Sequence, residues 1–170
     1  GIFSKLDIDQ CIPDRWRLSQ VPVTQEFIPE KFPVFLKPEW GQNSHGIMRI
    51  DALDEMLEAR ARVLTKKVAY MVQEAASGLR EFEIFYIRSP EDERNCALFS
   101  VTEVKNTCVD RYPINGIHNK CTVYKDFSNH ISARGVDLLW DHFKNLCTYR
   151  IARVGLRANA FEDILAGNFH

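Results

Sequence analysis

One short stretch constrains the fold more than any other part of the chain. Residues 32–37 have the composition of an apolar strand that ends in Lys37, a polar loop bracketed by Gly41 and Gly46 follows, and residues 47–50 form a second apolar segment. Glycine tolerates the dihedral angles with which a loop turns its backbone amides toward an anion. Lys37 adds a charge suited to phosphate. The pattern therefore predicts a phosphate-binding β-hairpin.

This hairpin is not a Walker loop. Gly41 and Gly46 have the spacing of that motif, but Ile47 and Met48 follow where a P-loop needs Lys and then Ser or Thr. The segment after the loop also has the pattern of a strand and not of a helix. If the loop holds phosphate, its lysine precedes the glycines.

Short strands and amphipathic helices alternate along the rest of the chain, which predicts an α+β fold. Asp51 is the expected N-cap of the first clear helix, and Cys96 to Lys105 is expected to place Phe99, Val101, Glu103 and Lys105 on one face. Helices are predicted over 51–65 and 135–148, with a loop or short helix over 158–167. Strands are predicted over 68–73, 81–88, 96–105 and 149–156, an extended piece over 21–24 and an interrupted helix over 8–17. Residues 106–132 are expected to be irregular.

The hairpin resembles the phosphate-covering hairpin of ATP-grasp enzymes, among them the D-alanine–D-alanine ligases and related carboxylate–amine ligases. The resemblance rests on Lys37-Pro38 followed by Ser44 and Gly46, and it covers about residues 20–170. It implies two small lobes, each with a mainly antiparallel sheet flanked by helices, and a nucleotide cleft between them. The implied division is an N-terminal segment over 1–30, a small lobe over 31–88 and a C-terminal lobe over 89–170.

The same resemblance implies a set of ATP-binding residues. The segment from Gln73 to Glu81 is similar to the connector of the family, in which the backbone binds adenine and a glutamate binds ribose. Gln73 or Glu74 takes the place of its leading glutamate, and Glu81 takes the ribose position if one extra residue is allowed after Gly78. The full set implied for ATP binding is Lys37, Gly41, Asn43, Ser44, Gly46, Gln73, Glu74, Ala76, Glu81 and Lys105. Lys5 and Lys31 are the early candidates for a second phosphate lysine.

The C-terminal part departs from the family's pattern. Arg153 matches the arginine of an R-x-D motif that stabilises transition-state charge, but Gly155 stands where an aspartate would bind Mg²⁺. The glutamate and asparagine expected just after His170 are also absent, so no metal ligand is assigned. We expect either a domain cut before the metal-binding strand, which we favour, or a chain that binds nucleotide poorly and does no chemistry.

The implied function is ATP binding in a ligase that activates a carboxylate as an acylphosphate for attack by an amine or another nucleophile. ATP is the implied cofactor, with Mg²⁺ in the complete parent protein, and the partners are small carboxylate and amine substrates. This chain alone is expected to be inactive. The alternative is a non-catalytic α+β nucleotide-binding or interaction module with a degenerate cleft. His118, Lys120 and Arg111 lie in the segment that resembles the family's substrate-closing loop, and His45 lies in the hairpin.

Composition excludes other classes of protein. The net charge of −1 and the lack of a basic patch with interleaved aromatics argue against a nucleic-acid partner. No apolar run is long enough for a membrane span, so we expect a cytoplasmic protein. The histidines have no metal-ligand spacing. The cysteines contain no CxxC pair, which argues against a disulfide framework, and most of them are expected to be thiols in a reducing compartment: Cys11, Cys96, Cys108, Cys121 and Cys147.

Overall fold

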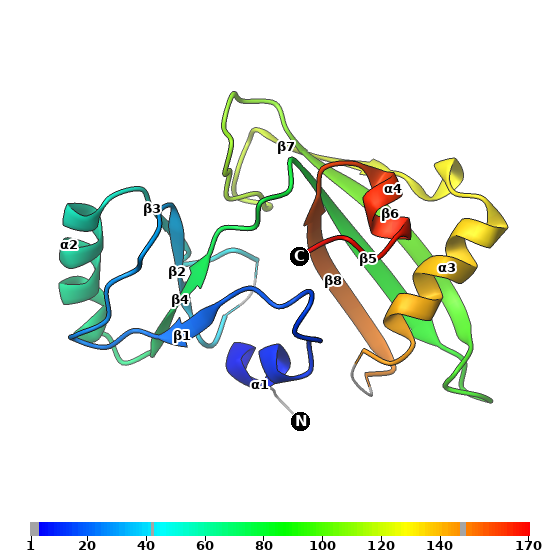
Figure 1. Ribbon diagram of the computed structural model, residues 1–170, viewed down its shortest axis with the longest axis horizontal. Helices are drawn as coiled ribbons and strands as arrows, with labels where there is room; N and C mark the ends of the chain where they lie inside the picture. The colour runs from blue at the N-terminus through cyan, green and yellow to red at the C-terminus, as the bar shows by residue number, and fades with distance from the viewer. Residues whose placement is uncertain (1–3, 42, 147–148) are drawn as a thin grey trace. The chain divides into compact units, whose positions relative to one another are not determined.

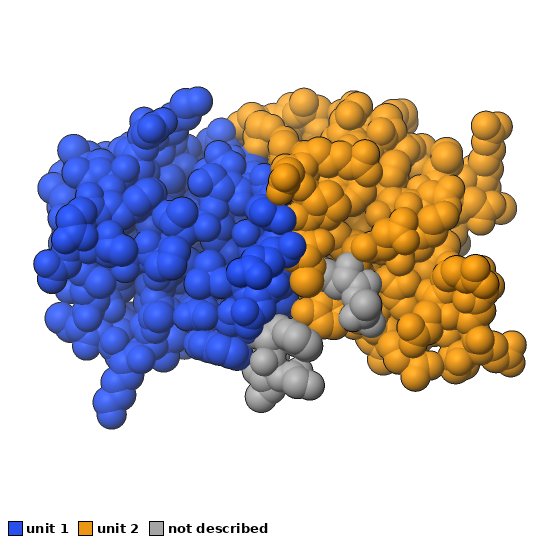
Figure 2. Space-filling view, turned by 60° about the horizontal axis from the view of Figure 1, so that its bottom comes forward, with its two compact units in different colours: residues 1–10, 17–76, 112–120 blue, residues 11–16, 77–111, 121–170 orange. Residues whose placement is uncertain are grey.

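The chain forms two compact units, each built on its own antiparallel sheet. The structure is a computed structural model that describes residues 4–41, 43–146 and 149–170. Figure 2 colours the units, which consist of residues 1–10, 17–76 and 112–120 (unit 1) and residues 11–16, 77–111 and 121–170 (unit 2). Each unit contains one four-stranded sheet. The predicted α+β class is therefore confirmed, while the predicted division at residues 30 and 88 stays a prediction.

Unit 1 has a small sheet with the strand order β1-β4-β2-β3, and one helix covers one of its faces (Figure 1). All neighbouring strands in it are antiparallel. Its elements are α1 (Lys5–Gln10), β1 (Gln20–Pro22), β2 (Val34–Pro38), β3 (Met48–Ile50), α2 (Leu53–Leu64) and β4 (Tyr70–Glu74).

The alternation of side chains along β2 divides this sheet into an apolar and a polar face. Val34 and Leu36 are buried against α2, in a cluster that includes Met56 and Val63. Because successive side chains of a strand point to opposite faces, Lys37 lies on the face away from α2. The core of unit 1 thus holds β2 so that its terminal lysine is presented on the polar face.

The predicted N-cap of α2 is wrong by one residue. Ala52 occupies the N-cap position, without a side-chain cap. The backbone N–H of Asp51 donates to the Glu55 carboxylate at 2.9 Å, and the Asp51 carboxylate accepts from Arg49 Nε at 3.0 Å. The carboxylate that we expected to cap the helix is therefore bound to Arg49, in the second strand of the hairpin, instead.

Unit 2 has a larger sheet with the strand order β7-β6-β5-β8, and two helices pack on one face of it (Figure 1). Phe82, Ile84 and Tyr86 of β5 alternate into a core that also contains Leu139 and Phe143 of α3. The elements are β5 (Arg80–Arg88), β6 (Cys96–Asn106), β7 (Thr122–Asp126), a 3₁₀ turn (Ser128–His130), α3 (Ala133–Phe143), β8 (Ile151–Ala158) and α4 (Phe161–Leu165). The predicted helix over 135–148 ends earlier, at Phe143, and residues 147–148 lie outside the described part.

Residues 106–132 are more regular than predicted. They contain β7, which pairs with β6 from Thr102↔Asp126 to Asn106↔Thr122. At the base of this hairpin Cys108 and Cys121 form a disulfide, so the expectation that these two are free thiols is wrong. The pairing depends on the register of β6 against β7, which brings together two cysteines 13 residues apart. Spacing along the sequence carries no such information.

Two close contacts tie distant parts of unit 2 together. The indole Nε1 of Trp16 donates to the Gly167 carbonyl at 2.8 Å, and its ring stacks on Phe169 with centroids 4.6 Å apart. Gly78 lies against β8 so closely that a Cβ there would be 2.4 Å from the backbone nitrogen of Ala158. Residues far apart in the sequence therefore close one core.

Candidate functional site

Lys37 is held in a row of polar side chains on the open face of the unit 1 sheet. The register places Phe35 of β2 opposite Gln73 of β4, and Gln73 opposite Gln20 of β1. Lys37 Nζ donates to Gln73 Oε1, and Gln73 Nε2 donates to Gln20 Oε1 at 2.9 Å. The structure thus brings together two predicted ATP-binding residues, Lys37 and Gln73, and adds Gln20, which no sequence motif indicated.

The loop after Lys37 has an unusual backbone. Gly41, Asn43, Ser44 and Gly46 all have positive φ angles, of +154°, +55°, +58° and +74°. Left-handed backbone costs a non-glycine residue roughly 1–2 kcal/mol, so Asn43 and Ser44 keep it only because their surroundings impose it. A Cβ at Gly46 would also lie 3.2 Å from the Tyr70 hydroxyl. A loop of this kind is a candidate anion-binding nest.

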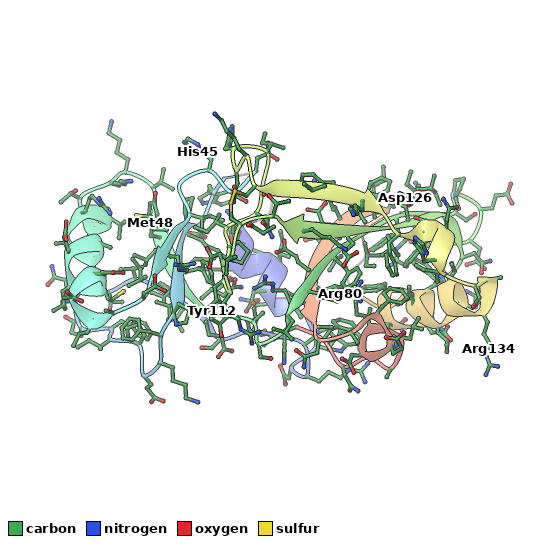
Figure 3. All side chains as sticks on the ribbon, turned by 90° about the horizontal axis from the view of Figure 1, so that it is seen from above. His45, Met48, Arg80, Tyr112, Asp126 and Arg134 are labelled. Carbon is green, nitrogen blue, oxygen red and sulfur yellow. A yellow bond between two sulfur atoms is a disulfide. The ribbon has the colours of Figure 1, made fainter. Side chains whose placement is uncertain are left out.

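A second segment of unit 1, residues 112–120, packs on this loop. The Ser44 hydroxyl donates to the Asn115 carbonyl at 2.8 Å, and Arg49 Nη1 donates to the Tyr112 carbonyl at 3.0 Å. Figure 3 labels His45 and Tyr112, and the rings of His45 and His118 meet edge to face with centroids 6.5 Å apart. The loop is therefore supported from outside its own hairpin, and His118 is the predicted substrate-loop residue that lies beside it.

Lys5 is a second lysine close to the hairpin loop. Its ammonium lies among backbone carbonyls of the loop, 2.7 Å from that of Pro38 and 3.0 Å from that of Gly41. Burial lowers the pKa of Lys5, and the charge of Glu39 partly opposes this shift. The sequence indicated Lys5 only as an early candidate phosphate lysine, whereas the structure places it on the carbonyls of the loop.

The remaining connector residues have mainly structural partners. Glu74 accepts a hydrogen bond from the backbone N–H of Ser19 at 2.6 Å and so fastens β1 to β4. Ala76 is buried. Glu81 lies in unit 2, where its carboxylate is 3.7 Å from Arg157 Nε. Their roles in adenine and ribose binding stay predictions.

The face of the unit 2 sheet away from its helices carries a cluster of opposite charges. Arg153 Nη1 lies 3.7 Å from the Glu83 carboxylate, and Glu81 lies on the same face because it is two residues from Glu83. Tyr124 belongs to this cluster. Burial raises the pKa of its hydroxyl, and the carboxylates of Glu83 and Glu81 add to the rise while Arg153 opposes it. Arg153 is thus on the same face as the predicted ribose residue.

Gly155 leaves an opening in this face. It pairs directly with Glu83 of β5, and a Cβ built on it would meet no atom within 4 Å. The position where the family's motif has an aspartate is therefore empty of side chain, with Glu83 across from it. No group of three or more His, Cys, Asp or Glu side chains that could hold a metal ion is found among the described residues.

Lys105 is on the opposite face of the same sheet. The pairing Glu81↔Val104 puts Lys105 on the other side from Glu81, beside the buried Glu103. Glu103 accepts from Arg80 Nη2 at 2.7 Å and lies 3.3 Å from Lys105 Nζ. Burial raises the pKa of the Glu103 carboxyl, but the hydrogen bonds and charges of Arg80 and Lys105 outweigh it and hold that pKa below its usual value. The structure does not bring Lys105 together with Arg153.

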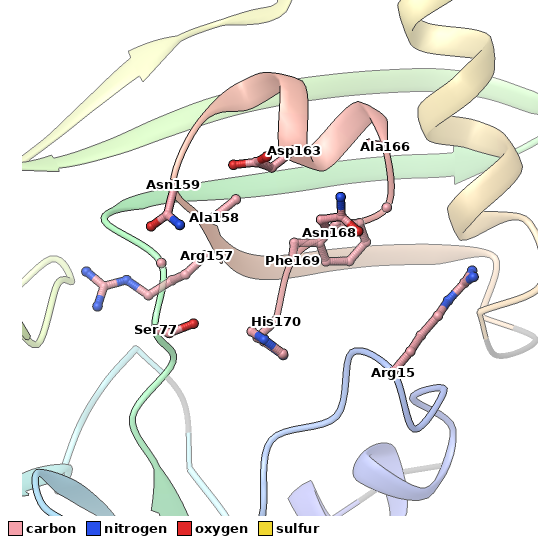
Figure 4. Close-up of a pocket in the computed structure, with 12 residues that line it drawn as sticks. Arg15, Ser77, Arg157, Ala158, Asn159, Asp163, Ala166, Asn168, Phe169 and His170 are labelled. Carbon is pink, nitrogen blue, oxygen red and sulfur yellow. The ribbon is translucent and has the colours of Figure 1, made fainter.

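Unit 2 also has a polar pocket of about 450 Å³ at its C-terminal end (Figure 4). Arg157 and Asp163 lie on its walls, and the buried Nε of Arg157 has no hydrogen-bond partner among the described residues. His170 pairs with Arg157 through two backbone hydrogen bonds of 2.7 and 3.1 Å, so the last residues form part of the lining. None of the predicted site residues lines this pocket.

Comparison with known proteins identifies the fold. No family model matches the chain, and no curated protein matches it in sequence. A carboxyaminoimidazole ribonucleotide synthase from Aspergillus clavatus, solved with ATP, has a TM-score of 0.63 at 12% identity and matches 92% of this chain and 41% of its own. An L-amino acid ligase from Bacillus licheniformis has a TM-score of 0.60 at 14% identity over 93% of this chain and 37% of its own. A D-alanine–D-alanine ligase from Bacillus anthracis, solved with ATP, has a TM-score of 0.54 at 13% identity over 84% of this chain and 46% of its own.

These structures are ATP-grasp ligases, so the predicted ATP-grasp fold is confirmed. At such identities the likeness concerns the fold alone. The chain spans less than half the length of each of these three proteins. In the part of the chain that the structure describes, no helix is both long and apolar enough to cross a membrane.

Proposed function

We propose that this chain is the ATP-binding part of an ATP-dependent ligase that joins a small carboxylic acid to an amine or another nucleophile. The observation that carries the proposal is the polar face of unit 1. There Lys37, at the end of β2, precedes a loop with four positive-φ residues. Two of the solved structures that share the fold contain ATP, which supports the same conclusion.

Each predicted residue has a definite task in this proposal. Lys37 would exchange its hydrogen bond with Gln73 for one to a phosphate oxygen, and the loop from Gly41 to Gly46 would cover the triphosphate through its backbone and the Asn43 and Ser44 side chains. The connector at Glu74 and Ala76 would bind adenine through its backbone. Glu81 would bind the ribose hydroxyls, and for this its carboxylate must turn from Arg157.

Arg153 and Lys105 are the proposed phosphate contacts of unit 2. Arg153 is more than half exposed and lies 3.7 Å from Glu83, so its guanidinium is available to stabilise charge on a transferred phosphoryl group. Lys105 would have to leave Glu103 to reach a phosphate.

The proposed reaction has two steps. A carboxylate oxygen of the acid attacks the γ-phosphorus of ATP, the bond to the bridging β-γ oxygen breaks, and an acylphosphate and ADP form. The amine then attacks the acyl carbon, inorganic phosphate leaves, and the amine loses a proton. Phosphoryl transfer of this kind uses Mg²⁺ in the resembling family, and we assign no Mg²⁺ ligand here because no group of three or more candidate ligand side chains is found among the described residues. The proposal for this chain is therefore confined to nucleotide binding and charge stabilisation, in a cytoplasmic parent protein.

Gly155 favours a second candidate function. Because this position opposite Glu83 carries no carboxylate, the chain could serve as a nucleotide-binding or interaction module without catalysis. The ligase and the nucleotide-binding form of this second candidate both require ATP to bind at Lys37. The two candidates differ in catalysis. Only the ligase, tested as a longer protein with its acid and amine substrates, would release ADP.

Calorimetric titration with ATP and Mg²⁺ tests the nucleotide site. Lys37→Met should weaken binding at least about tenfold, as expected for loss of one charge-assisted contact to phosphate. Lys67→Met is the matched control, because Lys67 is an exposed lysine of the same unit outside the hairpin. Absence of binding by the folded wild-type chain, or equal affinity of the Lys37 and Lys67 variants, would contradict the proposal.

A further inference from the structure

The start of α1 places the Lys5 side chain with little freedom. The Ser4 hydroxyl accepts from the backbone N–H of Asp7 at 3.1 Å, and the Asp7 carboxylate accepts from the backbone N–H of Ser4 at 3.1 Å. This reciprocal arrangement is a capping box, which satisfies two otherwise unpaired donors and defines the first helical residue. That residue is Lys5.

The ammonium group of Lys5 is surrounded by carbonyl oxygens of the hairpin loop. Its Nζ lies 2.7 Å from the carbonyl of Pro38, 3.0 Å from that of Gly41 and 3.4 Å from that of Glu39. The backbone N–H of Lys5 also donates to the Glu39 carbonyl at 3.3 Å, and Gln20 Nε2 lies 3.4 Å from the carbonyl of Lys5. An ammonium has three donors, and here three carbonyls receive them.

This arrangement sets the direction of the loop's peptide groups. Carbonyl dipoles that converge on one point repel each other unless a cation lies between them. The peptide between Pro38 and Glu39 shows the consequence, because its carbonyl accepts from Lys5 while its N–H donates to the Ala69 carbonyl at 2.8 Å on the opposite side. Since the C=O and N–H of a trans peptide point in opposite directions, drawing carbonyls toward Lys5 turns the following N–H groups away from it.

We propose that Lys5 is a positioning residue for the phosphate-binding hairpin: its ammonium holds the carbonyls of Pro38, Glu39 and Gly41, and so keeps the loop in its nucleotide-ready shape before ATP arrives. The inference rests on the proposed ATP site. It assigns Lys5 a different task from Lys37, whose ammonium donates to the side-chain oxygen of Gln73. In the nucleotide-free protein, Lys5 acts through the three carbonyls that it binds.

Two variants and one control separate this role from a general loss of stability. Lys5→Met removes the charge and all donors while keeping a similar length, Lys5→Arg restores charge and donors, and Lys67→Met removes an exposed charge elsewhere in unit 1. Hydrogen–deuterium exchange of the nucleotide-free proteins should be faster across residues 38–46 in Lys5→Met, slower again in Lys5→Arg and unchanged in Lys67→Met.

Titration with ATP and with adenosine gives the second measurement. A loop that holds its binding shape for about a tenth of the time binds about tenfold more weakly, so Lys5→Met should lose about that factor for ATP. Adenosine lacks the triphosphate, and its affinity should be the same for wild type and Lys5→Met. A merely structural role would weaken both ligands or neither.

The outcomes distinguish the two proposals. Unchanged exchange in 38–46 of Lys5→Met, or equal losses for ATP and adenosine, would overturn the role of Lys5 while leaving the ATP site in place. Failure of the wild-type chain to bind ATP would overturn the proposed function, and the role of Lys5 in nucleotide binding would fall with it. Faster exchange in 38–46 together with a selective loss of ATP affinity supports both.

Discussion

The close approach of Gly78 to β8 leads to a quantitative prediction. A Cβ at this position would lie 2.4 Å from the nitrogen, and 2.7 Å from the Cα, of Ala158, and 2.6 Å from the carbonyl carbon of Arg157. All three are backbone atoms, so no side chain can turn aside to make room. Gly78→Ala must therefore separate the connector from β8.

The required movement sets the size of the effect. Ordinary van der Waals contact for a Cβ begins near 3.4 Å, so the two backbones must part by about 1.0 Å, the difference between 3.4 and 2.4 Å. The displaced segment enters β5, whose first pair with β8 is Arg80↔Ala158. Overpacking of a core by one methyl group costs about 1–3 kcal/mol, and a clash against rigid backbone should lie at the upper end, about 3 kcal/mol.

Gly155→Ala is the matched control, because Gly155 lies on β8, the strand that Gly78 approaches. A Cβ there meets no atom within 4 Å, so the free energy of unfolding of this variant should be within about 0.5 kcal/mol of the wild-type value. Urea unfolding followed by tryptophan fluorescence measures both, because Trp16 and Trp140 report on unit 2. Equal stability of the Gly78 and Gly155 variants would refute the argument from close packing.

Two further predictions concern the β6–β7 side of unit 2. Glu103→Gln should lower the free energy of unfolding by about 1–2 kcal/mol at pH 7, because Arg80 and Lys105 lose their carboxylate partner but are themselves partly exposed. The pKa of Glu103 is held below the ordinary 4.5, so the difference from wild type should narrow as the pH falls through 4.5, and a constant difference down to pH 2 would contradict the assignment. Replacing Cys108 and Cys121 by Ser should destabilise unit 2 by up to about 3 kcal/mol, the loop-closure value for a short loop, as thermal unfolding would show. Complete alkylation of both thiols in the unreduced protein would contradict the disulfide.

Helices and strands such as α3 and β5 follow from local patterns of apolar residues that can be recognised in the sequence. Apolar residues at helical spacing predicted the existence and the buried face of α3, since Leu139 and Phe143 are fully buried, although not its end, and the apolar alternation of β5 continues through Phe82, Ile84 and Tyr86. In each case the side chains that define the period are those that the fold buries, so the signal and its cause are the same.

Features that depend on contacts between two distant segments could not be predicted from such local patterns. β7 has one half-buried and four exposed side chains, so its strand character comes from pairing with β6 and not from an apolar period. The disulfide depends on the same register. Asp51 is a good N-cap residue by type, yet Arg49 engages its carboxylate and the helix begins later.

The candidate site shows the same division. Lys37 and the glycines were predicted from their spacing, because a phosphate loop needs a charge and permissive backbone close together in the chain, and their role in phosphate binding stays a prediction. The contact of Lys37 with Gln73 needed the register of β2 on β4. The prediction that Lys105 shares a face with Glu103 was correct. The ion pairs of Glu103 with Arg80 and Lys105 on that face could not be predicted, because Arg80 lies on a different strand.

The way the chain is shared between its two units has a consequence for synthesis on the ribosome. The chain passes from one unit to the other five times, after residues 10, 16, 76, 111 and 120. Unit 1 lacks the segment that carries Tyr112 and Asn115 until β5 and β6 of unit 2 have been made, and β5 lacks its β8 neighbour until residues 151–158 emerge. Neither unit can finish folding in the order of translation, so a nascent chain stalled near residue 100 should leave the Ser44 loop without its support and exposed to proteases.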